Sequence, residues 1–168
     1  MRLRALAIAF SLVAIASSAG VVDTMTSMPA PPAGSERKYD IATLHPEDLK
    51  SCLVDVYSID TADALFEEER PKVEQEREEL RKLRDAAKGK PSSDAAAADA
   101  ELRTRTRAFN AHVAKLNSRV AYAQEARDRF SRNCKGRRYY VDEFIIVRNR
   151  LPAEVRSAIP RPETNPAK

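Results

Sequence analysis

The sequence of 168 residues contains no tryptophan, only four glycines and only two cysteines. So little cysteine excludes a small scaffold held together by many disulfides, and so little glycine excludes a collagen-like repeat. Each glycine also has a structural use, at a chain boundary, in a linker or at a helix end, so none remains for a phosphate-binding loop. These residues are Gly20, Gly34, Gly89 and Gly136.

Histidine is equally scarce, because the chain has only His45 and His112, which lie far apart in the sequence. A zinc site needs three or four clustered ligands, and the sequence offers no such cluster. We therefore expect a protein that is not an enzyme, with no catalytic residues, no cofactor and no metal site. His112 is interpreted as a partly exposed surface residue.

The first 19 residues have the order of a cleavable signal peptide. Met1–Arg4 carries two arginines, Ala5–Ala16 is an almost entirely apolar run, and the small residues Ser17–Ala19 follow. The apolar run is shorter than the roughly 20 residues that a membrane-spanning helix needs. We therefore predict cleavage before Gly20, a periplasmic or secreted protein, and no transmembrane span after signal removal. Cleavage at Ala14–Ala16 and an uncleaved anchor are the alternatives.

Composition divides the remainder into three parts. Residues 20–44 are rich in Pro, Ala, Ser and Thr and have no apolar periodicity, which predicts a disordered spacer. Residues 160–168 contain three prolines and are predicted to be a disordered tail. The helical-hairpin domain is assigned to residues 45–159, the only part of the chain that can bury a core.

The strongest pattern in this domain predicts a helix from Asp94 to Cys134. Ten positions at alternating steps of four and three residues include eight apolar ones, counting cysteine. This spacing averages 3.5 residues per turn and keeps one narrow face, here called the seam, toward a partner helix. Gly136 follows and can end the helix in a left-handed cap. The seam positions are Leu102, Thr106, Phe109, Val113, Leu116, Val120, Ala123, Arg127, Phe130 and Cys134.

The partner helix precedes this one in the sequence. An apolar residue recurs every seven positions from Phe66 to Ala87, but Glu69 and Glu76 interrupt the second row of this seam. Pro71 cannot donate the backbone hydrogen bond of a helix interior. We therefore favour a separate turn over residues 61–70, kinked against a helix that starts at Pro71.

The connector between the two helices, residues 88–93, is short, so the helices are expected to lie antiparallel. Charge favours the same pairing. Residues 40–79 carry thirteen acidic and four basic side chains, whereas residues 102–161 carry fifteen basic and five acidic ones. Folding one arm onto the other neutralises both, although each charged stretch could instead be a solvated helix face.

The two cysteines lie at similar distances from this connector. Cys52 precedes residue 91 by 39 positions and Cys134 follows it by 43, so antiparallel pairing brings them to nearly the same level. In an exported chain, two such cysteines are predicted to form a disulfide. Free thiols and metal ligands are the alternatives, but neither a CxxC motif nor a neighbouring histidine pair supports them.

Residues 139–147 form the most β-prone stretch of the chain, and periodicity leaves open whether they form a strand or a short third helix. Arginines and aromatic residues alternate around this stretch and could hold an anionic envelope glycan or lipid. Export argues against nucleic acid as the target. The alternative is that the arginines neutralise the acidic arm and the aromatic rings fill the core. The candidate residues are Arg137, Arg138, Tyr139, Tyr140, Arg148 and Arg150.

The sequence thus predicts an all-α fold: a long antiparallel helical hairpin of coiled-coil type, with a small disulfide-clamped base and disordered termini. The incomplete seam of the first arm leaves room for another helix. We therefore expect a non-enzymatic envelope or periplasmic protein whose hairpin is a structural or partner-binding arm, through an unknown protein partner or self-association. The alternative is a holdase-like periplasmic chaperone, or a binder of anionic envelope surfaces through the basic base.

Overall fold

The computed structural model describes residues 24–88 and 92–162 of the chain. The predicted signal peptide, residues 1–19, lies outside the described residues. So do the first four residues of the predicted spacer and the last six of the predicted tail.

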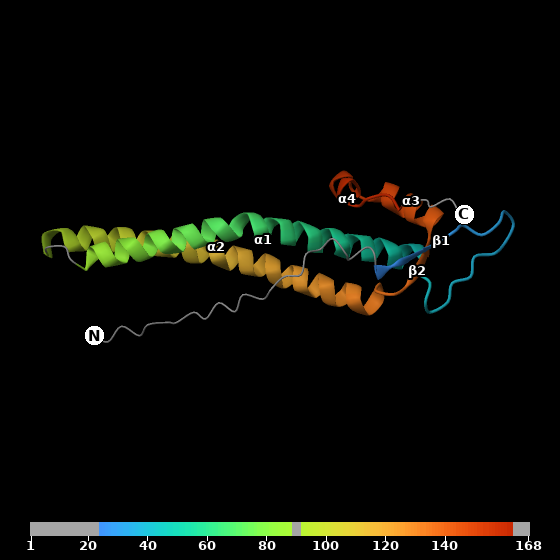
Figure 1. Cartoon of the computed structure of the whole chain (residues 1–168), viewed down its shortest axis with the longest axis horizontal. Coiled ribbons are helices and arrows are strands. Elements are labelled where there is room, and N and C mark those ends of the chain that lie inside the picture. Colours follow the sequence, from blue (N-terminus) through green and yellow to red (C-terminus); the bar gives the residue numbers. More distant parts are fainter. Residues whose placement is uncertain (1–23, 89–91, 163–168) are drawn as a thin grey trace.

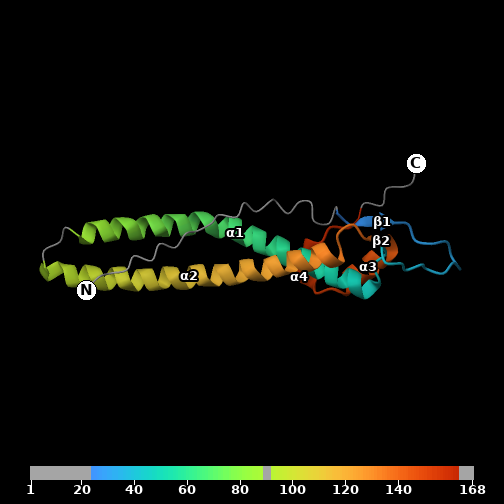
Figure 2. The same ribbon diagram turned by 90° about the horizontal axis from the view of Figure 1, so that it is seen from below.

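Two long helices dominate the structure (Figure 1). Helix α1 spans Pro46–Ala87 and helix α2 spans Ser92–Asn133. They run antiparallel as a hairpin, and they cross one another in both views (Figures 1 and 2), as the helices of a coiled coil do. The predicted hairpin architecture is confirmed.

The seam predicted for α2 faces α1. All ten seam positions are buried or half-buried, whereas most residues between them are exposed. The helix ends one residue before Cys134, and Gly136 follows with a φ of 77°, the left-handed conformation expected of a glycine after a helix end.

Helix α1 differs from the prediction at Pro71. Instead of a separate turn kinked against a second helix, one helix continues through this residue, which is exposed on the outer face. A proline removes one backbone hydrogen bond. Phe66 and Val73, one on each side of Pro71, are both half-buried in the seam, so packing against α2 supports the helix on both sides of that defect.

The core lies at the base of the hairpin, beside a pair of short C-terminal helices. These are α3, Val141–Arg150, and α4, Ala153–Ala158, which lie next to α1 (Figure 1). Apolar side chains from all four helices and from the chain before α1 meet there. The most completely buried are Leu44, Leu49, Leu53, Val56, Ile59, Ala126, Phe144 and Ile159.

A disulfide joins the two long helices inside this core. The Cα atoms of Cys52 and Cys134 are 5.8 Å apart, and each residue is 1% exposed. The predicted pairing is confirmed, and it fixes which residues of α1 and α2 lie at the same level.

The β-prone stretch after Cys134 is a strand only at its start. Strand β2 spans Arg138–Tyr140, and α3 begins at the next residue. The third-helix alternative is therefore the right one for residues 141–147. Phe144 and Val147 point into the base core, 1% and 5% exposed.

The prediction of a disordered spacer needs correction over residues 24–44. Strand β1, Thr26–Met28, pairs in parallel with β2, and Met25 and Leu44 are buried in the base. On the other side of β2, the backbone N–H of Arg138 donates to Ala42 and its carbonyl accepts from Leu44. Backbone groups at a buried site need partners, and this segment supplies them to β2. The segment is rich in proline and only a few apolar residues anchor it, so its sequence shows no apolar periodicity.

Removing the disulfide should destabilise the base strongly. Closing a loop across 82 residues is worth about 4.5 kcal/mol in the chain-entropy treatment of the unfolded state. We expect Cys52→Ala/Cys134→Ala to lose a comparable free energy of unfolding in urea titrations under oxidising conditions. Reductant should destabilise the wild-type chain but leave the variant unchanged. Equal stability of the oxidised and reduced wild-type chains would show that the disulfide does not contribute this free energy of unfolding.

Candidate functional site

Arg137 and Arg138, two of the six residues predicted to bind an anionic surface, form hydrogen bonds with other groups of the chain. The guanidinium of Arg137 donates to the carbonyls of Asn133 and Thr43, each at 3.1 Å. The guanidinium of Arg138 donates to Asp40 at 2.8 Å. These two arginines hold the segment before α1 against β2.

The other predicted members lie elsewhere on the base. Tyr139 is 4% exposed and its ring lies 5.1 Å from that of Phe144. Tyr140 donates to the carbonyl of Lys38. Arg148, near the far end of α3, donates to the carbonyl of Ile159 at 2.7 Å, and Arg150 ends that helix, exposed. The structure does not gather the six residues into one surface, and anion binding by them stays a prediction.

A second polar cluster, absent from the sequence-based candidates, ties the N-terminal segment to α3. Arg37 pairs with Asp142, and Tyr39 donates a hydrogen bond to Glu143, which is only 4% exposed. Burial, and then this hydrogen bond, raise the pKa of Tyr39 to about 12. The phenol therefore stays protonated and remains a donor to Glu143 throughout the neutral range.

Ion pairs also cross the hairpin at several levels. Near the base, Arg129 lies 2.7 Å from Asp55, and Arg127 pairs with Asp63. Toward the tip, Arg105 lies 2.7 Å from Glu79. Each acid comes from α1 and each base from α2, so opposite charges of the two arms meet, as the charge distribution favoured.

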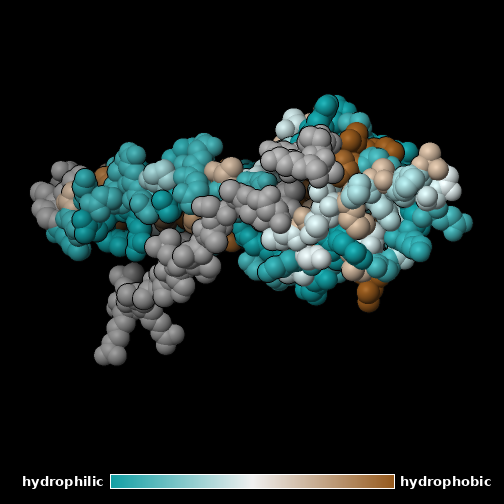
Figure 3. Space-filling view, turned by 45° about the vertical axis from the view of Figure 1, so that its right-hand side comes forward, coloured by the Kyte–Doolittle hydropathy of each residue, from teal (hydrophilic) through white to brown (hydrophobic). Residues whose placement is uncertain are grey.

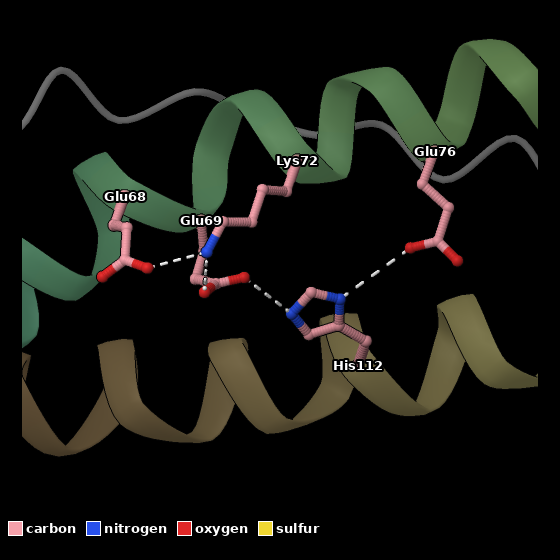
Figure 4. A network of polar contacts seen from close by, with 5 residues as sticks. All are labelled: Glu68, Glu69, Lys72, Glu76 and His112. Atoms are coloured by element: carbon pink, nitrogen blue, oxygen red, sulfur yellow. Dashed lines mark hydrogen bonds and ion pairs between the residues drawn. The ribbon is translucent and has the colours of Figure 1, made fainter.

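The middle of the hairpin contains a layer of polar side chains at and beside the seam (Figure 4). The ring of His112 lies between Glu69, 3.1 Å from Nε2, and Glu76, 3.9 Å from Nδ1. Lys72 binds Glu69 and Glu68 at 2.9 and 2.7 Å. The two glutamates that interrupt the apolar row of α1 thus face the histidine of α2.

The sequence did not predict this layer, because its members come from two helices and none of them has a distinctive spacing within its own helix. His112 lies 22 residues before Cys134, so the disulfide register places it opposite position 74, between Glu69 and Glu76. Combining the predicted disulfide with the predicted antiparallel pairing was the signal that could have found the contact.

This layer joins the two helices through polar contacts in the middle of the hairpin. Within residues 24–88 and 92–162, no group of three or more His, Cys, Asp and Glu side chains could hold a metal ion. Polar residues in a coiled-coil seam specify register and oligomeric state at a cost in stability. We assign that role to Glu69, Glu76 and His112.

The surface of the hairpin differs between its two ends (Figure 3). The long arm is mostly hydrophilic, whereas the base carries brown patches of apolar surface. Ile145 and Ile146 of α3 are 40% and 46% exposed, and Ile41 is almost fully exposed. None of the helices described is long and apolar enough to span a membrane.

The chain matches no protein-family model, no curated protein and no solved structure. We therefore infer its function from the geometry of its own residues.

Replacing the mid-hairpin layer with leucine should stabilise the hairpin while weakening its specificity. We expect Glu69→Leu/Glu76→Leu/His112→Leu to raise the melting temperature by several degrees and to produce mixed oligomers in sedimentation, because a continuous apolar seam no longer favours one register. Gln124→Leu/Glu125→Leu/Asp128→Leu is the matched control on exposed positions of α2 nearer the base. An equal rise in both triple variants would mean that the layer has no special role.

The hairpin should lose stability in acid. The hydrogen bond from Lys72 lowers the pKa of Glu69, with His112 acting in the same direction, and the hydrogen bond from Arg105 lowers the pKa of Glu79. A lowered pKa in the folded chain means that the stabilisation is present above the ordinary value of 4.5 and is lost as pH falls through the folded values.

We expect the urea midpoint to fall steadily from about pH 5 to about pH 3. The fall should be smaller in Glu79→Gln, whose side chain does not titrate. If Glu79→Gln shows the same acid response as the wild-type chain, this carboxylate does not contribute to it.

Proposed function

We propose that the chain is an exported, non-enzymatic envelope protein whose helical hairpin is a structural or partner-binding arm. One observation carries the proposal: the apolar seam stays half open along the shaft, defined as residues 64–88 of α1 and 95–122 of α2. Within these ranges only Leu80 is buried. A two-helix seam that its own chain covers only in part is suited to receiving a further helix.

The division of the molecule into base and shaft supports the same function. The base holds nearly all of the buried apolar side chains together with the disulfide. The shaft extends away from it (Figure 1) and adds only Leu80 to the buried apolar residues. The shaft contributes almost nothing to the buried core of the base. We therefore infer that the length of the shaft serves a function outside the base.

Two features support export. The first 19 residues have the charge, apolar run and small residues of a signal peptide. Both cysteines of the chain form one buried disulfide, a bond that persists in oxidising compartments such as the periplasm.

The proposal is tested by crosslinking from the seam in cells that export the full chain. A photoreactive residue at Leu83 or Val113, both half-buried in the seam, should give discrete crosslinked products in the envelope fraction. The same residue at Ser51 or Ser131, which are exposed outside the shaft, should not. Mass measurement of the exported chain should show loss of residues 1–19. A chain that stays in the cytoplasm, or that is exported with its disulfide intact yet gives no seam crosslinks, would overturn the proposal.

A further inference from the structure

We propose that the partner of the shaft is a second copy of this chain, which packs against it with both tips pointing the same way, so that the two hairpins form a four-helix bundle. This inference rests on the proposed function and names the occupant of the open seam. Three observations support it: the open seam, the size of the shaft, and the distribution of charge along it.

The open seam contains large apolar side chains on both helices. Val73 and Leu83 of α1 are half-buried, as are Phe109, Val113 and Leu116 of α2. Each therefore retains apolar surface that a two-helix arrangement cannot cover. In a four-helix bundle, side chains of this type lie between all four helices and are covered.

The size of the shaft fits a dimer of ordinary extent. About 25 residues of helix rise about 37 Å, and two helices side by side are about 20 Å wide. One face of the shaft thus offers about 750 Å² per copy. Specific protein interfaces bury about 800 Å² per partner, so the shaft alone is large enough.

Each helix of the shaft has one mainly acidic stretch and one mainly basic stretch, and the order of the two stretches from base to tip is opposite in α1 and α2. Residues 67–79 of α1 carry seven acidic and three basic side chains, whereas residues 103–119 of α2 carry five basic and no acidic ones. Nearer the tip the signs reverse: residues 81–88 of α1 are mainly basic, and residues 99–101 of α2 include Asp99 and Glu101. The two helices therefore carry opposite charge at the level of residues 67–79 and again near the tip at Asp99 and Glu101, although Arg103 and Arg105 lie at the level of the basic stretch of α1.

Part of this charge is not used within the chain. Arg105 pairs with Glu79, and Arg103 with Asp99. By contrast Arg107, Lys115 and Arg119 of α2 form no ion pair with any described residue. These three cations remain available to an acidic helix of another molecule.

The charge pattern selects one symmetry. A two-fold axis along the shaft places α1 of each copy against α2 of the other, at the same level and with tips together. A two-fold axis across the shaft places α1 against α1 and α2 against α2, with tips at opposite ends. Only the first arrangement repeats, between copies, the complementary pairing that each hairpin already makes internally. Since α3 and α4 flank only the part of α1 near the base (Figure 1), they leave the shaft free.

The arrangement is tested with spin labels on the mature chain, whose own two cysteines are joined in the disulfide. Ala100→Cys places a label near the tip and Ser131→Cys near the base, both at exposed positions. Labels at the same site in two copies should lie within about 30 Å of each other. Mixed copies, one labelled at each site, should show a distance of about 45 Å or more, the length of helix between the sites.

Charge reversal tests the interface itself. Arg107→Glu/Lys115→Glu/Arg119→Glu should weaken dimerisation at least about tenfold in sedimentation. Mixing this variant with Glu67→Lys/Glu68→Lys/Glu74→Lys should restore dimers as a heterodimer. Arg132→Glu/Lys135→Glu/Arg150→Glu changes the net charge equally at exposed positions outside the shaft, and should dimerise like the wild-type chain.

Several outcomes would overturn the inference. Three results would each do so: a folded chain that sediments as a monomer, a short distance between tip and base labels in mixed copies, or weakening of dimerisation by the Arg132/Lys135/Arg150 control variant equal to that by the Arg107/Lys115/Arg119 variant. A monomer whose seam still crosslinks to another protein in the envelope would overturn this inference and leave the proposed function standing. A monomer with no seam crosslinks would overturn both.

Discussion

The bond between Cys52 and Cys134 is the constraint on which the rest of the hairpin depends. Two long amphipathic helices can slide past one another by whole heptads with little change in apolar contact. A covalent link between their base ends, with Cα atoms 5.8 Å apart, permits only one alignment. Every cross-hairpin pair, from Asp55 with Arg129 to Glu79 with Arg105, agrees with that alignment.

Base and shaft are held together by different kinds of interaction. The base combines buried side chains such as Phe144 and Ile159 with the disulfide and with strand pairing of the N-terminal segment. The shaft relies on a half-open seam crossed by polar contacts, of which the His112 layer is the most central. The buried core thus lies almost entirely in the base, whereas the seam of the shaft stays half-exposed.

The sequence predicts the features of the fold that depend on local patterns, and it does not predict those that depend on contacts between distant residues. Spacing and position, which a sequence displays directly, predict three features. These are the seam of α2, the cap at Gly136 and the pairing of Cys52 with Cys134. The continuity of α1 through Pro71 could not be predicted, because tertiary packing outweighed a local defect. The ordered segment before α1 was missed because few residues, chiefly Met25 and Leu44, anchor it. For the candidate arginines the sequence left two interpretations open, and the contacts of Arg137 with backbone carbonyls and of Arg138 with Asp40 agree with the one in which they serve the fold.

The parallel pairing of β1 with β2 also sets an order of events during folding. A chain that emerges from its N-terminus first presents Thr26 long before Arg138 is available to pair with it. Likewise, Cys52 cannot form its disulfide until Cys134 has been synthesised. The contacts that close the base therefore join residues far apart in the sequence, whereas the antiparallel helices of the hairpin are joined by a short connector. Because the chain has only two cysteines, this delay exposes Cys52 to no wrong partner within the molecule.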